Sequence, residues 1–378
     1  MIPEIERQLL SKETDHTQRV LIRVGDVNVE LKLSHPDQFK YIERFGFPHI
    51  HAGDETSKPS YSLLAIKDES FQAATLIPSD AQTDEDGLFW GRGIDFQFIG
   101  STKFNYLNLY WQEDGRKHIA CVGKYPEYGL ASYLKALLLS DYRSSHDAIT
   151  FHAATIVNTN NQKSIVVSTA DHQEERRRFG KTTTMLSCLT DPDRSFAFAT
   201  NDELILGWNN DDLVVLPFPN EIPIRESALS RSGLDIHTST LLEAYTETDP
   251  ITQEKLRVAT STGLIESGYQ VSNIDKISYW FFVDLHPDLT DLVPEFITSD
   301  KAKEMFKRSI FERRVREMNG ELAYGEHLYV QPSLPENLDA ELERMFTQLT
   351  GQGVQFILLT GGMNQDKMRD IIKQITNQ

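Results

Sequence analysis

The sequence predicts an α/β protein, with a mixed α+β domain over residues 1–145 and a helix-covered sheet domain over residues 146–378. Strand-like alternation dominates the first part until one long helical pattern at 128–142. Beyond residue 145, short apolar runs alternate with helical stretches, a pattern typical of a sheet with helices packed on it. A chain of 378 residues is also long enough for two domains.

The N-terminal elements follow from alternation and from turn residues. Residues 20–24 and 27–31 alternate apolar and polar side chains on either side of Gly25 and Asp26, which predicts two strands joined by a tight turn. The glycines of 87–93 predict a hairpin. Further strands are expected at 61–66, 95–98, 106–111 and 118–122.

The C-terminal elements follow from apolar runs of strand length and from helical periodicity. The acidic, Ser/Thr-rich segment 230–270 interrupts the alternation and is expected to be an insertion or flap. Strands are expected at 149–157, 164–167, 195–199, 204–207, 213–216, 277–283, 327–330 and 355–359, and helices at 182–189, 302–318, 338–349 and 366–375.

Composition limits the classes of function. Lys and Arg number 38 against 56 Asp and Glu, a net charge of −18, so the chain lacks the basic footprint of a non-specific nucleic-acid binder. Cys121 and Cys188 are too few for a disulfide framework, which favours a reducing compartment. The sequence holds no run of about 18 apolar residues, so we expect a cytoplasmic protein without a membrane partner.

The segment Gly180-Lys181-Thr182-Thr183 is the strongest functional signal. It follows the apolar run at 164–167 and opens a helical stretch, and Gly-Lys-Thr at such a helix start is typical of nucleotide phosphate binding. Backbone amides and the lysine contact phosphate oxygens in such loops, and the next hydroxyl reaches Mg²⁺. The full pattern has a glycine where this chain has Glu175, so a surface turn that caps a helix stays open as the alternative.

Three further segments lie where a phosphotransferase needs them. His152 lies in the expected strand at 149–157. Asp202, preceded by Asn201, follows a later strand, and a carboxylate there is suited to hold Mg²⁺ or to accept a hydroxyl proton. A proline-rich segment then leads to Arg225, a candidate phosphate clamp. The ordinary alternatives are a hydrogen-bonded core histidine, a strand-end carboxylate and a helix-capping arginine.

The order and spacing of these segments resemble the HPr kinase/phosphorylase-like family, whose nucleotide fold is related to that of PEP carboxykinase. The matching residues are Phe151-His152-Ala153-Ala154, Gly180-Lys181-Thr182-Thr183, Asn201-Asp202 and Pro217-Phe218-Pro219 through Ile224-Arg225. The resemblance covers roughly residues 148–226 and implies a PEP carboxykinase/HPr kinase-like P-loop nucleotide-binding domain. The chain departs from the family at Asn201, where the family has the first of two aspartates.

The resemblance implies an ATP-dependent kinase that transfers the γ-phosphoryl group to a hydroxyl acceptor, either a protein or peptide serine or a small molecule, with ATP and Mg²⁺. The implied residues are Asp202, Lys181, His152 and Arg225 for catalysis, Gly180, Lys181, Thr182 and Thr183 for the nucleotide, and Thr182 and Asp202 for the metal. The N-terminal domain is expected to serve acceptor recognition or oligomer contacts, because relatives often assemble as homo-oligomers.

Two rival interpretations stay open. Asn201 is consistent with a catalytically inactive nucleotide-binding partner protein, and Glu175 with an α/β protein that binds no nucleotide. The arginines at 176–178 either close over the γ-phosphate or belong to a solvated loop, since Glu174 and Glu175 balance their charge. His49 and His51 lack the further ligands of a metal site and are expected in a loop.

Overall fold

The computed structural model is a mixed α/β structure with several sheets. It divides into two compact units, one up to Asp141 and the other from Tyr142 onward in the described residues. The division falls inside helix α3 (Pro126–His146), which also contains residue 145, the boundary expected from the sequence. The structure describes residues 18–24, 27–39, 42, 50–53, 59–77, 81–83, 87–92, 96–102, 105–113, 115–124, 126–170, 180–216, 218, 222–225, 256–259, 261–286, 289–310 and 337–378.

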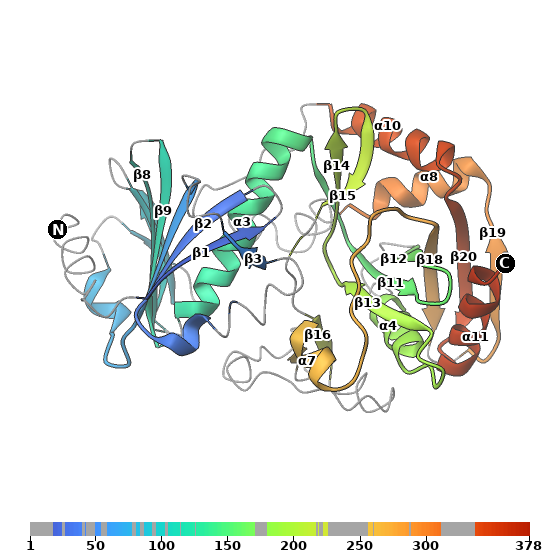
Figure 1. Ribbon diagram of the computed structural model, residues 1–378, viewed down its shortest axis with the longest axis horizontal. Helices are drawn as coiled ribbons and strands as arrows, with labels where there is room; N and C mark the ends of the chain where they lie inside the picture. Colours follow the sequence, from blue (N-terminus) through green and yellow to red (C-terminus); the bar gives the residue numbers. More distant parts are fainter. Residues whose placement is uncertain are drawn as a thin grey trace. The chain divides into compact units, whose positions relative to one another are not determined.

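The first unit is built on one nine-stranded sheet of order β3-β1-β2-β4-β9-β8-β7-β6-β5 (Figure 1). The pairs β2–β4 and β4–β9 are parallel, and the other neighbours are antiparallel. Its elements are β1 (Gln18–Val24), β2 (Val27–Leu33), β3 (Ile50–Ala52), β4 (Tyr61–Lys67), η1 (Ala73–Leu76), β5 (Gln82–Thr83), β6 (Leu88–Arg92), β7 (Phe96–Ser101), β8 (Tyr106–Glu113) and β9 (Arg116–Gly123).

Strand β2 carries a buried carboxylate on the face opposite its apolar side chains. Glu30 accepts a hydrogen bond from Ser62 Oγ at 3.1 Å and pairs with Arg116 at 2.6 Å and with Arg19. Burial by itself raises the pKa of Glu30, but the arginines and Ser62 outweigh this effect and lower the pKa below its ordinary value. Glu30 therefore stays ionised at neutral pH and links β2 to β1, β4 and β9.

The second unit is built on a six-stranded sheet of order β13-β11-β12-β18-β20-β19 (Figure 1). Strands β12, β18 and β20 run parallel, and the other neighbours are antiparallel. The strands are β11 (Ala153–Asn158), β12 (Lys163–Thr169), β13 (Phe196–Thr200), β18 (Tyr279–His286), β19 (Leu292–Phe296) and β20 (Gln355–Gly362).

Helices cover both faces of this sheet. Buried side chains of α4 (Lys181–Leu189) and α11 (Gln365–Thr376) share one core cluster with Val167, Phe281 and Val283. Those of α8 (Ser299–Arg308) and α10 (Leu338–Gly351) share a second cluster with Val166 and Phe282. Because successive side chains of a strand point to opposite faces, the two clusters lie on opposite sides of the sheet.

The single strand expected at 149–157 is wrong, because the chain changes sheets at His152. Strand β10 (Ile149–Phe151) pairs with β14 (Leu204–Asn209) in a three-stranded sheet that β15 (Asp212–Val215) completes. Strand β11 then continues in the six-stranded sheet. The amide of His152 donates to the carbonyl of Ser309 at 2.7 Å, outside both ladders. A continuous apolar run carries no periodic signal that marks such a division.

The helix expected at 302–318 begins at Ser299 and ends at Arg308. Ser309 Oγ donates to the carbonyl of Phe306 at 2.7 Å, and Ile310 forms a β-bridge with Phe151, so the chain leaves the helix there. The remainder of that expected helix and the strand expected at 327–330 lie outside the described residues.

The expected flap at 230–270 is described only in its last part. There, β17 (Leu256–Ala259) pairs with β16 (Ile222–Arg225), and helix α7 (Ser261–Glu266) follows. The edge strand β19 was not expected, because Pro294 weakens its strand pattern, and an edge is the position where a sheet tolerates proline. Among the described residues, no helix has the length and apolar character needed to span a membrane.

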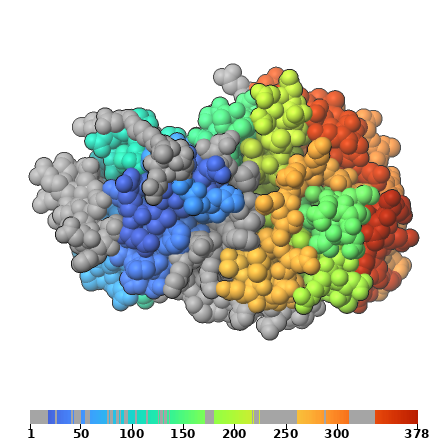
Figure 2. All heavy atoms as spheres, viewed as in Figure 1, coloured from blue at the N-terminus to red at the C-terminus, as the bar shows by residue number. Residues whose placement is uncertain are grey.

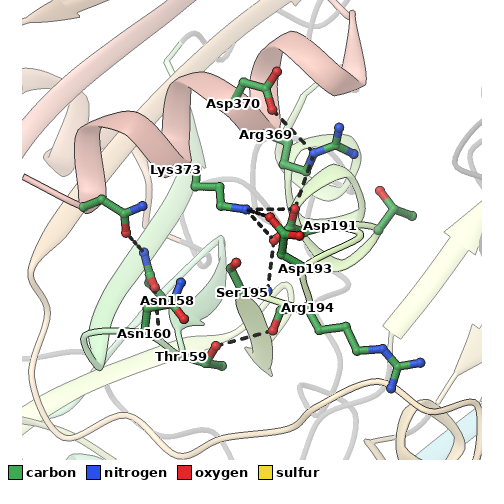
Figure 3. Close-up of polar contacts among 12 residues, drawn as sticks. Asn158, Thr159, Asn160, Asp191, Asp193, Arg194, Ser195, Arg369, Asp370 and Lys373 are labelled. Carbon is green, nitrogen blue, oxygen red and sulfur yellow. Dashed lines mark hydrogen bonds and ion pairs between the residues drawn. The ribbon is translucent and has the colours of Figure 1, made fainter.

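A polar cluster fixes α11 beside the start of β13 and the turn after β11 (Figure 3). Lys373 donates to Asp191 at 3.1 Å, and Asp191, whose side chain is 3% exposed, also accepts the Ser195 amide at 2.9 Å. Asn158 Nδ2 donates to Thr376 Oγ1 at 3.0 Å. Figure 2 accordingly shows α11, in red, against the green turn between β11 and β12. These contacts hold the last helix onto the unit that carries the candidate site.

We expect Asp191→Asn to lower the free energy of unfolding at pH 7 by about 1–3 kcal/mol, because Lys373 loses its buried carboxylate. Burial raises the pKa of Asp191, but hydrogen bonds from Ser195 and Lys373 outweigh it and hold the pKa below its ordinary value. A lowered folded-state pKa gives stability that is complete above the unfolded pKa of about 4 and is lost as the pH falls through the folded value.

Urea unfolding checks this expectation. The difference between wild type and Asp191→Asn should be full at pH 7 and should shrink as the pH falls below about 4. Asp193→Asn is the matched control, because Asp193 also binds Lys373 but its side chain is 77% exposed, and it should cost less than about 1 kcal/mol. Equal costs for the two variants at pH 7 would contradict the assignment.

Candidate functional site

The start of helix α4 lies directly on strand β18. Gly180 caps the helix with φ of 130°, and its carbonyl accepts the Thr184 amide at 2.7 Å. A Cβ at Gly180 would lie 2.8 Å from Val283 Cγ2 and 3.3 Å from Leu285. Both the positive φ and this close approach require glycine, which explains why the Gly-Lys-Thr segment has glycine at position 180.

Lys181 is the first residue of α4 and is only 5% exposed. Its Nζ donates to Asn201 Oδ1 at 3.2 Å and forms an ion pair with Asp202 Oδ1. Asn201 Nδ2 in turn donates to Asp202 Oδ2 at 2.9 Å. The charge of the buried ammonium is thus compensated by a carboxylate, as a buried cation requires.

Asp202 lies in a tight turn between β13 and β14. Its φ is 64°, in the left-handed region, and the Glu203 amide donates to the Asn201 carbonyl at 2.8 Å across it. Thr200 Oγ1 donates to the Glu203 carbonyl at 3.1 Å and supports the turn. Aspartate tolerates this conformation better than most residues, and non-glycine residues held there are concentrated at functional sites.

His152 and Asp202 lie close together at the point where two paired chain segments, 151–155 and 200–204, pass between the three-stranded and the six-stranded sheet. Phe151 pairs with Leu204 in the three-stranded sheet, and Thr155 pairs with Thr200 in the six-stranded one. Between these pairs the ladders separate, and His152 Nε2 lies 3.7 Å from Asp202 Oδ1. The structure therefore brings three of the four expected catalytic side chains, Lys181, Asp202 and His152, into one polar cluster.

The other expected residues follow Lys181 in α4 or lie in β16. Thr182 and Thr183 are half-buried in the first turn of α4. The backbone of Arg225 ends β16, next to Ile224, which packs in the same core cluster as α4, but its side chain is outside the described structure. The arginines at 176–178 also lie outside the described residues.

Asp284, near the carboxyl end of β18, was not among the residues expected from the sequence, and it lies on the face of the strand opposite to α4. It directly follows the apolar run that predicted this strand, and β18 is the parallel neighbour of β12, the strand that precedes the Gly180-Lys181-Thr182 segment in the chain. Asp284 Oδ1 lies 3.5 Å from His286 Nε2, and both side chains are about one-third exposed.

The cluster is chemically suited to an anion with a metal. Helix amides and a lysine at a helix start attract phosphate, and carboxylates and hydroxyls bind Mg²⁺. Within the described residues, no group of three or more His, Cys, Asp or Glu side chains forms a metal site by itself.

No protein-family model matches the chain, and a search of curated proteins finds no match.

Proposed function

We propose that the second unit is a HPr kinase-like P-loop domain that binds ATP and transfers its γ-phosphoryl group to a hydroxyl acceptor. The observation that carries the proposal is Lys181, a buried lysine at the first position of α4 whose charge is held by Asp202 and Asn201. A helix N-terminus with such a lysine offers amides and a cation to the same anion. The order strand, loop, Gly-Lys-Thr and helix supports the same interpretation.

In this proposal, Lys181 and the amides of 180–183 bind the phosphates, and Thr182 and a carboxylate, Asp202 in the simplest case, bind the metal. Mg²⁺, when bound with the nucleotide, neutralises phosphate charge. Asp202 accepts the proton of the acceptor hydroxyl, and His152 holds the Asp202 carboxylate in place. Arg225 is proposed to stabilise the transferred phosphate. Most of the acceleration comes from positioning and charge compensation.

Asn201 favours a second candidate, a nucleotide-binding protein without catalysis that acts through a partner. The family that the sequence resembles has two aspartates at positions 201 and 202, for metal binding and proton acceptance. The amide of Asn201 performs neither task as a carboxylate does, so Asp202 alone remains for both. The first unit serves acceptor recognition or oligomer contacts under the first candidate and partner binding under the second.

Calorimetric titration with ATP, with and without Mg²⁺, tests the proposal, followed by phosphate release from ATP with water as acceptor. Binding and turnover support the kinase, and binding without turnover in any acceptor screen supports the partner protein. Absence of ATP binding under both conditions contradicts both candidates and leaves an α/β protein that binds no nucleotide.

A further inference from the structure

The side-chain amide of Asn201 joins the two charged groups of the candidate site. Its Oδ1 accepts a hydrogen bond from Lys181 Nζ at 3.2 Å, and its Nδ2 donates to Asp202 Oδ2 at 2.9 Å. An ammonium only donates and an ionised carboxylate only accepts, so the orientation of the amide follows from its two neighbours. A group between them must both accept and donate, which a primary amide does and an ionised carboxylate does not.

These contacts hold the Asp202 carboxylate in one direction. Lys181 pairs with Oδ1 and Asn201 donates to Oδ2, so each carboxylate oxygen has a donor. Asn201 itself is held by the turn, because it is fully buried and its carbonyl accepts the Glu203 amide at 2.8 Å. An ionised carboxylate has about four lone-pair sites. The two contacts therefore orient Asp202 and still leave it able to accept a proton.

The neutral amide also sets the charge of the cluster. Lys181 is 5% exposed, and with Asp202 it forms a pair of opposite charges. A second carboxylate at the buried position 201 would add an uncompensated negative charge, and two carboxylates in one site disfavour each other's ionised form. In the proposed function, the phosphates bring further negative charge to the start of α4. An uncharged residue at position 201 suits both the buried pair and the phosphates.

We propose that Asn201 is a positioning residue of the proposed kinase, which orients the Asp202 carboxylate for the acceptor hydroxyl and holds Lys181 without adding charge. This inference rests on the proposed function. It gives the departure from the paired aspartates a role in catalysis, whereas the second candidate treats the same departure as a loss.

Asn201→Asp separates these two interpretations, because aspartate has the size of asparagine and restores the pair. If position 201 only lacks a carboxylate, the variant should bind ATP with Mg²⁺ more tightly and turn over faster than wild type. If Asn201 positions Asp202, turnover at pH 7 should fall at least about tenfold, since the carboxylate loses its donor and is misplaced. ATP should bind about fivefold more weakly, the effect of one added unit charge at about 4 Å in a water-like medium. Phosphate release with water as acceptor and calorimetric titration measure the two effects.

The pH dependence of this variant shows whether the amide acts through its donor. A protonated carboxyl group donates through its hydroxyl and accepts through its carbonyl oxygen, as the amide does. Burial and the charge of Asp202 favour this protonated form, and the Lys181 ammonium opposes it less because Asp202 already neutralises it. The ratio of variant to wild-type turnover should therefore rise as the pH falls from about 8 to about 5, which a general loss of packing would not produce.

Urea unfolding gives a measurement without nucleotide. Asn201→Asp should unfold at a lower urea concentration than wild type at pH 7. The difference should shrink toward about pH 4, the ordinary pKa of aspartate, because a carboxyl group whose folded-state pKa is raised costs stability as the pH rises. Asn210→Asp is the matched control, the same change at an exposed turn residue with φ of 56°, and it should leave turnover and ATP affinity unchanged.

Asn201→Ala removes both contacts without a change of charge, so turnover should fall at least about tenfold while ATP affinity is retained. Wild-type or higher turnover in Asn201→Asp at pH 7, or wild-type turnover in Asn201→Ala, would overturn the inference and leave the proposed function standing. Absence of ATP binding or of turnover in wild type would overturn the proposed kinase and this inference with it.

Discussion

Asp202→Asn is expected to lower the turnover of ATP by about 10²-fold or more while ATP remains bound, the scale expected when a general base is removed. Asp202 is the carboxylate that both Lys181 and His152 approach in the cluster. Asparagine preserves the size of the side chain and an oxygen for Lys181, but it neither accepts a proton nor carries charge. The fold and the phosphate contacts should therefore survive the change.

The same substitution should have a second effect that separates binding from chemistry. Because it removes a negative charge next to Lys181, ATP without Mg²⁺ should bind about fivefold more tightly, the effect of one unit charge at about 4 Å in a water-like medium. Phosphate release with water as acceptor and calorimetric titration measure the two effects. Glu203→Gln is the matched control in the same turn, and loss of turnover in this variant instead would move the chemistry to Glu203.

The sequence predicts the strands and helices of both units well where the pattern is local. The alternation in 18–33 and the helical pattern that became α3 depend only on residues close in the chain. The division at His152 depends instead on which distant strand each half pairs with, Leu204 for one half and Thr200 for the other. A propensity argument contains no information about that choice, so the expected single strand was wrong.

The candidate site shows the same limit. The Gly-Lys-Thr motif, the carboxylate after a strand and the resemblance to a family identified Lys181, Asp202 and His152 as candidates, and the structure brings their side chains together. Nothing in the sequence indicated that Asn201 contacts both Lys181 and Asp202, because those contacts depend on a turn in which Asp202 has a left-handed conformation. The parallel pairing of β18 with β12 likewise depends on strand order, which a local sequence pattern does not contain.

Lys181→Ala is expected to weaken ATP binding at least about tenfold, because it removes the cation at the start of α4 and with it a charge-assisted contact of the kind worth about 1.5–3 kcal/mol. The structure adds a second cause. Without the ammonium, the Asp202 carboxylate loses its ion pair and repels the phosphates. The double variant Lys181→Ala, Asp202→Asn should therefore bind ATP more tightly than Lys181→Ala alone, a coupling that two independent residues would not show.

Two variants separate this effect from loss of folding. Lys181→Met retains the buried aliphatic part of the side chain and should unfold near the wild-type temperature, while it binds ATP as weakly as Lys181→Ala. Lys367→Ala removes an exposed lysine from α11 and should leave ATP affinity unchanged. Calorimetric titration of the four proteins with ATP and Mg²⁺ is the measurement. Wild-type ATP affinity in both Lys181 variants would show that α4 does not begin at a phosphate site, since both variants remove the positive charge of Lys181.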